Sequence, residues 1–424
     1  MKKIILFSAI FISVFASLTF TACLKDKCVS SKNYISYTPI YKTLEAIRAE
    51  GITMLTAREL KKTGKIYSYK NYLIINELRE GLHIIDNQNP SNPLPVGFLK
   101  ISGNIDMAIK GDILYADNFT DLLAIDLSNI LQPKIESRQI NIFLPIGFAS
   151  DPSLGIITGY DEKAVSVPCN SPSSYYEGQV AFFSIDDAVF NSFGAINSSV
   201  PSAISGIGGS QARFTLYDNY LYAVDNTSLQ TFNIANLKAP VFMSRTQVGF
   251  GIETIFPYKN RLFIGSTTGM FIFDNSNPSA PRQLSQFTHA RACDPVFATE
   301  NRAYVTLHVG TGCGGTQNQL DVLDISNLSS PTLIKSYPMN SPKGLSVSEN
   351  KLFLCDAGLK VFDVSNDSNI DNKLLSHWTG ANTYDVIALE SQKIILVVGE
   401  NGLFQFDYRD ANNLKLLSKM EVKK

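Results

Sequence analysis

Three features of the sequence predict an all-β fold made of many short strands. The first is composition, because the chain of 424 residues contains 18 Tyr and 26 Phe but a single Trp, and its apolar runs are short and evenly spread. The second is a short stretch that recurs along the chain, and the third is another apolar run ahead of each copy. Short apolar runs separated by polar turns are typical of half-buried strands.

The recurring stretch is an apolar strand that ends in Asp and continues into a polar turn closed by Pro. Clear copies read LHIIDNQNPSNP, MFIFDNSNPSAP and LDVLDISNLSSP. Weaker copies carry Asn233 or Ser184 in place of the aspartate. The copies lie 39 to 58 residues apart. The aspartates at this position are Asp86, Asp126, Asp274, Asp324, Asp363 and Asp407.

Each copy is the third of four short strands, as in YLIINE followed by LHIID and then LPVGFLKI. Four strands in about 40 to 45 residues, repeated, predict the blades of a β-propeller. Blades packed around an axis cover both faces of each sheet, which a single four-stranded sheet cannot do alone. Eight copies favour eight blades over residues 62–424. The alternative count of seven treats the degenerate third copy, which begins near Pro145, as an excursion.

Residues 1–22 have the pattern of an export signal, in which Lys2 and Lys3 precede an apolar run over residues 4–20. The run ends in FTAC, which is similar to a bacterial lipobox. We therefore expect removal of residues 1–22 and lipidation of Cys23. Secretion with cleavage elsewhere and an uncleaved anchor helix are the alternatives.

The lipid on Cys23 is then the expected contact with the membrane, and residues 23–61 are the expected tether. Within the tether, residues 41–51 predict a short helix that places Leu44 and Ile47 on one side and ends at a glycine. We expect this helix to pack on a propeller face or on the seam between the first and last blades.

The repeat resembles the LVIVD repeat, and the whole chain is similar to a group of bacterial LVIVD-repeat lipoproteins frequent in Bacteroidota. The stretches that carry the resemblance include ISGNIDMAIKGDILYAD and CDPVFATENRAYVTLHVGTGCGGTQNQLDVLDISN. The resemblance covers residues 57–424 and implies a β-propeller. It implies little about function, because most members of the group are uncharacterised.

The repeated aspartate is interpreted as a turn clasp. Asp, Asn and Ser side chains all accept hydrogen bonds from backbone N–H groups one or two residues further on. The alternative is a ring of carboxylates for a metal ion. One carboxylate per blade, far apart around the rim, cannot converge on one ion, so we expect no metal and no cofactor.

Charged residues at matched positions of the innermost strands form a candidate binding site at one mouth of the central channel. A cation, a sugar or a peptide terminus would bind there. The favoured alternative is a solvated channel in which polar side chains satisfy one another and water. The glycine-rich residues 206–213 lack the pattern of a phosphate loop and are interpreted as a linker. The candidate residues are Asp106, Glu253, Asp294, Lys343 and Asp385.

A disulfide between Cys293 and Cys313 is predicted, because both lie on one face of the same expected blade. The alternative is a reactive or metal-bound thiol pair near His308. Cys355 lies within an apolar strand and is expected to be a buried, unreactive side chain.

Composition and motifs favour a binding role over catalysis. The net charge of −1 gives no basic patch for nucleic acid. No catalytic motif is present, and the histidines lie on strands that do not meet. The expected function is a lipid-anchored scaffold of the bacterial envelope, at the outer membrane, which binds an unknown protein or glycan partner. The alternatives are a lactonase-like or lyase-like enzyme with a channel site and a structural envelope component.

Overall fold

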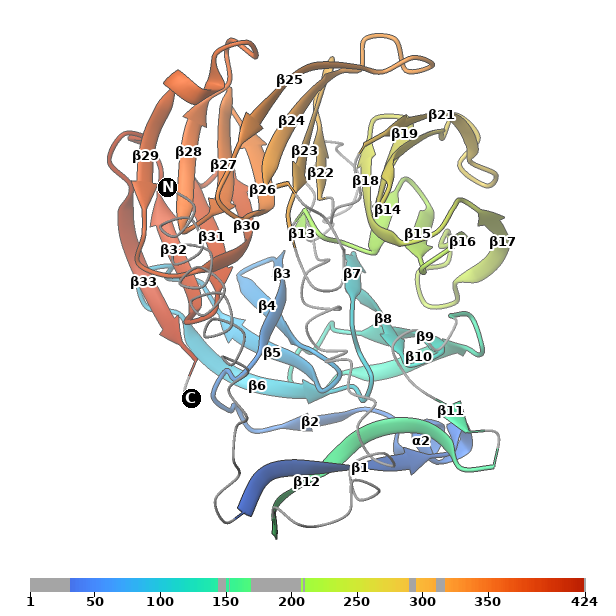
Figure 1. The fold of residues 1–424 in the computed structure, drawn as a ribbon. Helices are drawn as coiled ribbons and strands as arrows, with labels where there is room; N and C mark the ends of the chain where they lie inside the picture. The colour runs from blue at the N-terminus through green and yellow to red at the C-terminus, as the bar shows by residue number, and fades with distance from the viewer. Residues whose placement is uncertain are drawn as a thin grey trace, which may run out of the picture. The chain divides into compact units, whose positions relative to one another are not determined.

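The computed structural model describes residues 31–143, 150–151, 153–168, 207–208, 210–289, 295–309 and 317–422. Within these residues, seven sets of four consecutive antiparallel strands surround a common centre (Figure 1). The predicted β-propeller is therefore confirmed. The described residues form seven blades, the lower of the two counts that the repeats allow, and the favoured count of eight is corrected.

Strands are numbered along the chain, and each blade runs from its innermost to its outermost strand. Blade 1 contains β3 (Thr63–Tyr69), β4 (Tyr72–Glu77), β5 (Gly81–Asp86) and β6 (Leu94–Lys100). Blade 2 contains β7 (Met107–Lys110), β8 (Ile113–Asn118), β9 (Asp121–Asp126) and β10 (Lys134–Gln139). Blade 3 contains β14 (Phe214–Tyr217), β15 (Tyr220–Val224), β16 (Ser228–Asn233) and β17 (Val241–Gln247).

The other blades follow the same order. Blade 4 contains β18 (Ile252–Tyr258), β19 (Arg261–Ser266), β20 (Gly269–Asp274) and β21 (Arg282–Thr288). Blade 5 contains β22 (Val296–Ala298), β23 (Arg302–Leu307), β24 (Gln319–Asp324) and β25 (Thr332–Pro338). Blade 6 contains β26 (Pro342–Ser348), β27 (Lys351–Asp356), β28 (Leu359–Asp363), the 3-10 turn η1 (Ile370–Asn372) and β29 (Leu374–Trp378). Blade 7 contains β30 (Thr383–Leu389), β31 (Ile394–Gly399), β32 (Gly402–Asp407) and β33 (Lys415–Glu421).

Apolar side chains from alternate strand positions fill the space between neighbouring blades. The seam between blades 7 and 1 is closed in this way, because Ile66 and Leu73 pack with Leu396 and Val398. Each such side chain, when fully buried, contributes about 1.5 to 3 kcal/mol. In the described chain the ring thus closes by packing of blade faces, with one parallel bridge between Leu60 and Val422 at its outer end.

Blade 1 is extended at both of its edges. The short strand β2 (Thr53–Leu55) pairs with the outermost strand β6. The two-residue strand β13 (Ile207–Gly208) pairs with the innermost strand β3, although more than 100 residues separate them in sequence. Figure 1 shows β13 at the centre of the ring of blades. The chain therefore returns to the channel after blade 2.

The third sequence copy is where the expected eighth blade fails. The apolar run LGIITGY, which would be the second strand of this copy, lies almost entirely within β12 (Gly155–Pro168), which pairs with β1 (Ser31–Lys42) and with β11 (Ser150–Asp151) in a separate three-stranded sheet. Hydrogen bonds to β1 and β11 occupy both edges of β12, so it is not the second strand of a blade. Of the described residues, 31–40 and 159–168 form one compact unit, and the others form a second.

The predicted helix is present as α2 (Leu44–Glu50). The hydroxyl of Thr43 accepts a hydrogen bond from the N–H of Ala46, and Gly51 follows the last turn with a positive φ of 61°. These are the usual N-cap and C-terminal residues of a helix. In the described residues, every helix is too short or too polar to cross a lipid bilayer.

Helix α2 packs on the propeller face that carries the hairpins between second and third strands. Its Ile47 is buried against Leu78 and Phe119, which lie in these hairpins of blades 1 and 2. Arg48 adds two hydrogen bonds to the Asp121 carboxylate, at 2.8 and 3.0 Å. Of the two expected positions, the helix occupies the face rather than the seam.

Candidate functional site

The strand registers define one equivalent position at the start of every innermost strand. It is the residue directly before the innermost-strand residue that pairs with the fourth residue of the second strand, as Ile66 pairs with Ile75 in blade 1 and Val386 with Val397 in blade 7. We call the seven residues at this position the inner ring. In order of blade they are Lys65, Asp106, Arg213, Thr254, Pro295, Gly344 and Asp385.

The charged members of the inner ring lie in four consecutive blades and alternate in sign. Lys65 Nζ lies 2.5 Å from Asp106 Oδ2, and both side chains are almost fully buried. The same carboxylate accepts a hydrogen bond from the N–H of Phe214 at 2.9 Å and one from the N–H of Arg213. Burial lowers the pKa of Lys65, and the charge of Asp106 opposes that shift. These contacts join blades 1, 2 and 3 at the centre.

Asp385 completes the alternation on the other side of Lys65. Its side chain is 2% exposed, and Oδ1 accepts the N–H of Val386 at 2.9 Å, whereas Oδ2 has no hydrogen-bond partner among the described residues. Burial raises its pKa well above the usual range, and the charge of Lys65 opposes this shift. The carboxyl group is thus held in a dry site beside a paired cation.

The segment from β13 to Arg213 crosses the channel and contacts innermost strands from several blades. Ser210 Oγ accepts the N–H of Leu345 in blade 6 at 2.8 Å, and Gln211 Nε2 donates to the carbonyl of Tyr384 in blade 7 at 3.4 Å. The carbonyl of Ala212 accepts the N–H of Ile255 in blade 4 at 2.8 Å. With the β13–β3 pairing in blade 1, these bonds place the segment between opposite sides of the ring. This stretch, interpreted from sequence as a linker, is a structural part of the channel.

The structure brings together only some of the residues that were predicted to form a binding site at the mouth of the channel. Asp106 and Asp385 belong to the inner ring, whereas Glu253 and Lys343 stand one residue earlier. The turn between the first and second strands has two residues in blades 4 and 6 but four in blade 7, so spacing counted along the sequence does not align these strands. Lys343 Nζ lies 4.6 Å from the centre of the Tyr384 ring, and burial lowers the pKa of its ammonium group.

Some predicted site residues lie outside the described residues. These are Cys23, Asp294, and the proposed disulfide pair Cys293 and Cys313. Cys355 is described and is fully buried, and burial raises the pKa of its thiol far above the usual range. In the described part of the chain, no group of three or more His, Cys, Asp or Glu side chains is placed to hold a metal ion.

The repeated Asp or Asn forms the same turn in all seven blades. In each, a side-chain oxygen accepts the N–H of the residue two positions further on, at 2.7 to 3.0 Å. A second such bond follows three residues later in most blades, where Asn89 Oδ1 accepts the N–H of Ser91 and Asn327 Oδ1 accepts the N–H of Ser329. The sequence contains this second Asn, but the sequence pattern does not predict that its side chain also binds the turn.

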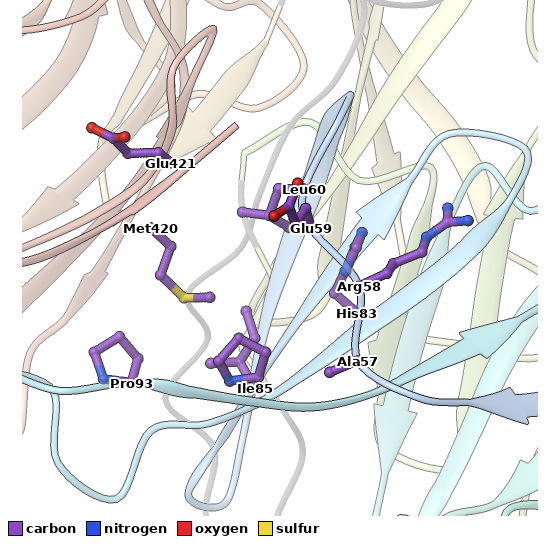
Figure 2. A pocket seen from close by; sticks show the side chains of 10 residues that line it. Ala57, Arg58, Glu59, Leu60, His83, Ile85, Pro93, Met420 and Glu421 are labelled. Atoms are coloured by element: carbon purple, nitrogen blue, oxygen red, sulfur yellow. The ribbon is translucent and has the colours of Figure 1, made fainter. Parts of the chain in front are cut away.

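A pocket of 460 Å³ opens at the seam between blades 7 and 1 (Figure 2). We call it the seam pocket. Three elements enclose it: the segment before blade 1, strands β5 and β6 with the turn between them, and the end of β33. Its charged or polar lining residues are Arg58, Glu59, His83 and Glu421. Its apolar lining residues are Ala57, Leu60, Ile85, Pro93, Pro95 and Met420.

The wall of the seam pocket contains a fixed histidine. His83 Nε2 lies 2.5 Å from Glu77 Oε2, and its ring packs edge-on against Phe98 with centroids 4.8 Å apart. Burial by itself would raise the pKa of Glu77, but the hydrogen bond and charge of His83, with help from Arg58, lower it overall. The Arg58 guanidinium lies over the Phe98 ring at 3.6 Å.

The Glu77–His83 contact has counterparts in other blades. Asp225 accepts a hydrogen bond from Gln230 at 2.7 Å, and Asp356 accepts one from Lys360 at 2.5 Å. In each case an acid at the end of the second strand meets a side chain on the third strand. The contact therefore locks a hairpin, and His83 is held in place by the repeat architecture.

In the described residues, fold and site together define a class, a β-propeller of seven four-stranded blades whose centre is crossed by a segment of its own chain. The family model of the LVIVD repeat matches residues 62–99, 314–338 and 341–374, which include strands of blades 1, 5 and 6. The chain therefore contains LVIVD repeats within a β-propeller fold. No curated protein is significantly similar to it in sequence.

Several solved structures share the fold. A protein from Lactobacillus plantarum has 11% identity and a TM-score of 0.51, with 85% of this chain and 96% of that chain covered. Saccharomyces cerevisiae Sqt1 has 10% identity and a TM-score of 0.50, with 91% of each chain covered. BamB from Moraxella catarrhalis has 7% identity and a TM-score of 0.47, with 84% and 96% covered. At such identities the similarity shows the fold alone.

Proposed function

We propose that this protein is a binding scaffold of the bacterial envelope, anchored by a lipid on Cys23 and located at the outer membrane. It presents one propeller face to a protein partner, with a glycan as the alternative. The observation that carries the binding role is the filled channel. Its central segment and the Lys65–Asp106 pair are used by the fold itself, which leaves the hairpins around the channel as the recognition surface.

The partner surface is the set of hairpins that join second and third strands. Helix α2 already covers part of this face at blades 1 and 2. The hairpins of blades 4, 6 and 7 remain, and exposed residues at their tips include Thr268, Ala357 and Glu400. Loops presented by a rigid scaffold are common binding surfaces.

Photo-crosslinking in intact cells tests this surface. A photoreactive amino acid replaces Thr268 or Glu400 on the proposed face, with matched controls at Lys259 or Ser391 in the hairpins between first and second strands. We expect a discrete crosslinked protein from the first pair and none from the second. Equal crosslinking from both pairs, or none from either, contradicts a protein partner on this face.

The anchor needs a separate test. Metabolic labelling with an alkyne fatty acid should label the wild-type chain and leave Cys23→Ser unlabelled. Labelling of the Cys23→Ser chain, or no labelling of the wild type, would exclude the lipid on Cys23. The crosslinking result is unaffected by this outcome if the chain still reaches the envelope.

A further inference from the structure

We propose that the seam pocket binds a small organic cation with an apolar body. Its volume of 460 Å³ falls within the range of about 300 to 1,000 Å³ that small-molecule sites occupy. The proposal is independent of the partner surface described above, because it concerns a different set of residues.

The apolar part of such a ligand has a matching surface. Leu60, Ile85 and Met420 come from three different elements and contribute aliphatic side chains to one hollow (Figure 2). Pro93, directly before β6, and Pro95, within β6, add two rigid rings. Burial of an apolar ligand group against these side chains removes both surfaces from water, which favours binding.

The sign of the ligand charge follows from the carboxylates. Glu59 and Glu421 both line the pocket. The Arg58 cation is shared between Glu80, with which it forms a hydrogen bond, and Glu77 at 3.4 Å. Among the lining residues themselves, the two carboxylates of Glu59 and Glu421 outnumber the one guanidinium of Arg58, and Lys419 lies 2.6 Å from Glu421. A positive ligand group is therefore favoured over a negative one.

The pocket wall is organised before any ligand arrives. His83 is fixed between Glu77 and Phe98, and Arg58 is fixed over the same Phe98 ring. A wall whose side chains are already held loses little conformational freedom on binding, which favours affinity for small ligands.

Methionine methyl spectra of the full chain test the proposal with three probes of similar shape. The probes are 2-phenylethylamine as the cation, 2-phenylethanol as the neutral analogue and phenylacetate as the anion. Met420 is the reporter, assigned with Met420→Leu, and Met270, buried between other blades, is the internal control. We expect a saturable shift of the Met420 signal, two- to fivefold tighter binding of the amine than of the alcohol, and the weakest binding for phenylacetate.

Two variants make the result specific. Ala57→Phe fills the exposed side of the pocket and should abolish the shift for all three probes. The double variant Glu59→Gln/Glu421→Gln should bind the amine and the alcohol equally. The distant variant Glu349→Gln should still bind the amine more tightly than the alcohol. The proposal is overturned if Met420 does not respond to the amine, if Ala57→Phe responds like the wild type, or if the amine preference is absent or survives the double substitution.

Discussion

Asn87 of blade 1 and Gln405 of blade 7 exchange two hydrogen bonds across the seam that closes the ring. Asn87 Nδ2 donates to Gln405 Oε1 at 3.0 Å, and Gln405 Nε2 donates to Asn87 Oδ1 at 2.6 Å. Both side chains are buried, and they are 318 residues apart in sequence. Because a shift of one blade against the other would leave two buried amides unpaired, the pair makes the closure specific in register.

Replacement of one amide should therefore destabilise the propeller. In Gln405→Leu the Asn87 amide stays buried without its partner, and we expect a loss of about 1 to 3 kcal/mol in the free energy of unfolding. The double variant Asn87→Leu/Gln405→Leu should lose less than the sum of the single losses. Urea unfolding measures both, with the exposed Gln392→Leu as a control that changes stability little. Additive losses would contradict a direct coupling of the two amides.

Lys65→Met should be among the most destabilising single substitutions at the channel. It leaves the Asp106 carboxylate buried without its cation, and breaking one partner of a buried pair typically costs about 3 to 5 kcal/mol. Lys70 is in the same blade as Lys65, and Lys70→Met breaks its half-exposed pair with Asp112 of blade 2. This variant should cost less than about 1 kcal/mol. Equal unfolding midpoints for the two variants would show that the inner ring is solvated.

Asp117 should make the stability fall with rising pH. Burial raises the pKa of Asp117 to about 7, and the nearby Asp106 charge acts in the same direction, against backbone hydrogen bonds and Lys65. Between about pH 4 and pH 7, the Asp117 carboxyl therefore keeps its proton in the folded chain but releases it in the unfolded chain. The stabilisation by the protonated form is complete at low pH and is lost as the pH rises through 7.

Asp117→Asn isolates this effect, because an amide oxygen can still accept the N–H groups of Ile105 and Asp106. We expect the free energy of unfolding of the variant, relative to the wild type, to rise from pH 4 to pH 7 by about 1 to 4 kcal/mol. Urea unfolding at several pH values measures the difference. A difference that does not change over this interval would rule out a raised pKa.

The turn clasp needs an oxygen rather than a charge. Asp363 accepts the N–H of Ser365 at 2.8 Å, and Asn233 accepts the N–H of Ala235 at the same distance in blade 3. Asp363→Asn should thus remain within about 0.5 kcal/mol of the wild type. Asp363→Ala should lose about 0.5 to 1.5 kcal/mol, since one hydrogen bond is removed. A loss as large for Asn as for Ala in thermal unfolding would mean that the charge itself matters.

The propeller could be predicted because its information is local and repeated. A strand that ends in Asp86 or Asp274 and continues into a polar turn forms the same third strand and the same clasped turn in each blade. The blade count could not be settled in this way, since the third copy retains an apolar strand whose partner lies far away in β1. The predicted set of residues at the mouth of the channel was also wrong in part. The turn after the innermost strand is two residues longer in blade 7 than in blade 6, so spacing along the chain does not align Lys343 with the position that Asp385 occupies.

The sequence by itself determined the four-stranded blade, the clasp after its third strand and the short helix that ends at Gly51, because each depends on residues close together in the chain. Only the tertiary structure decided what lies at the centre and at the seam. Ser210 meets Leu345 there, and Leu60 meets Met420 around the seam pocket, across 135 residues or more. Such contacts depend on how the ring closes, and side chains brought together by ring closure share no pattern along the chain.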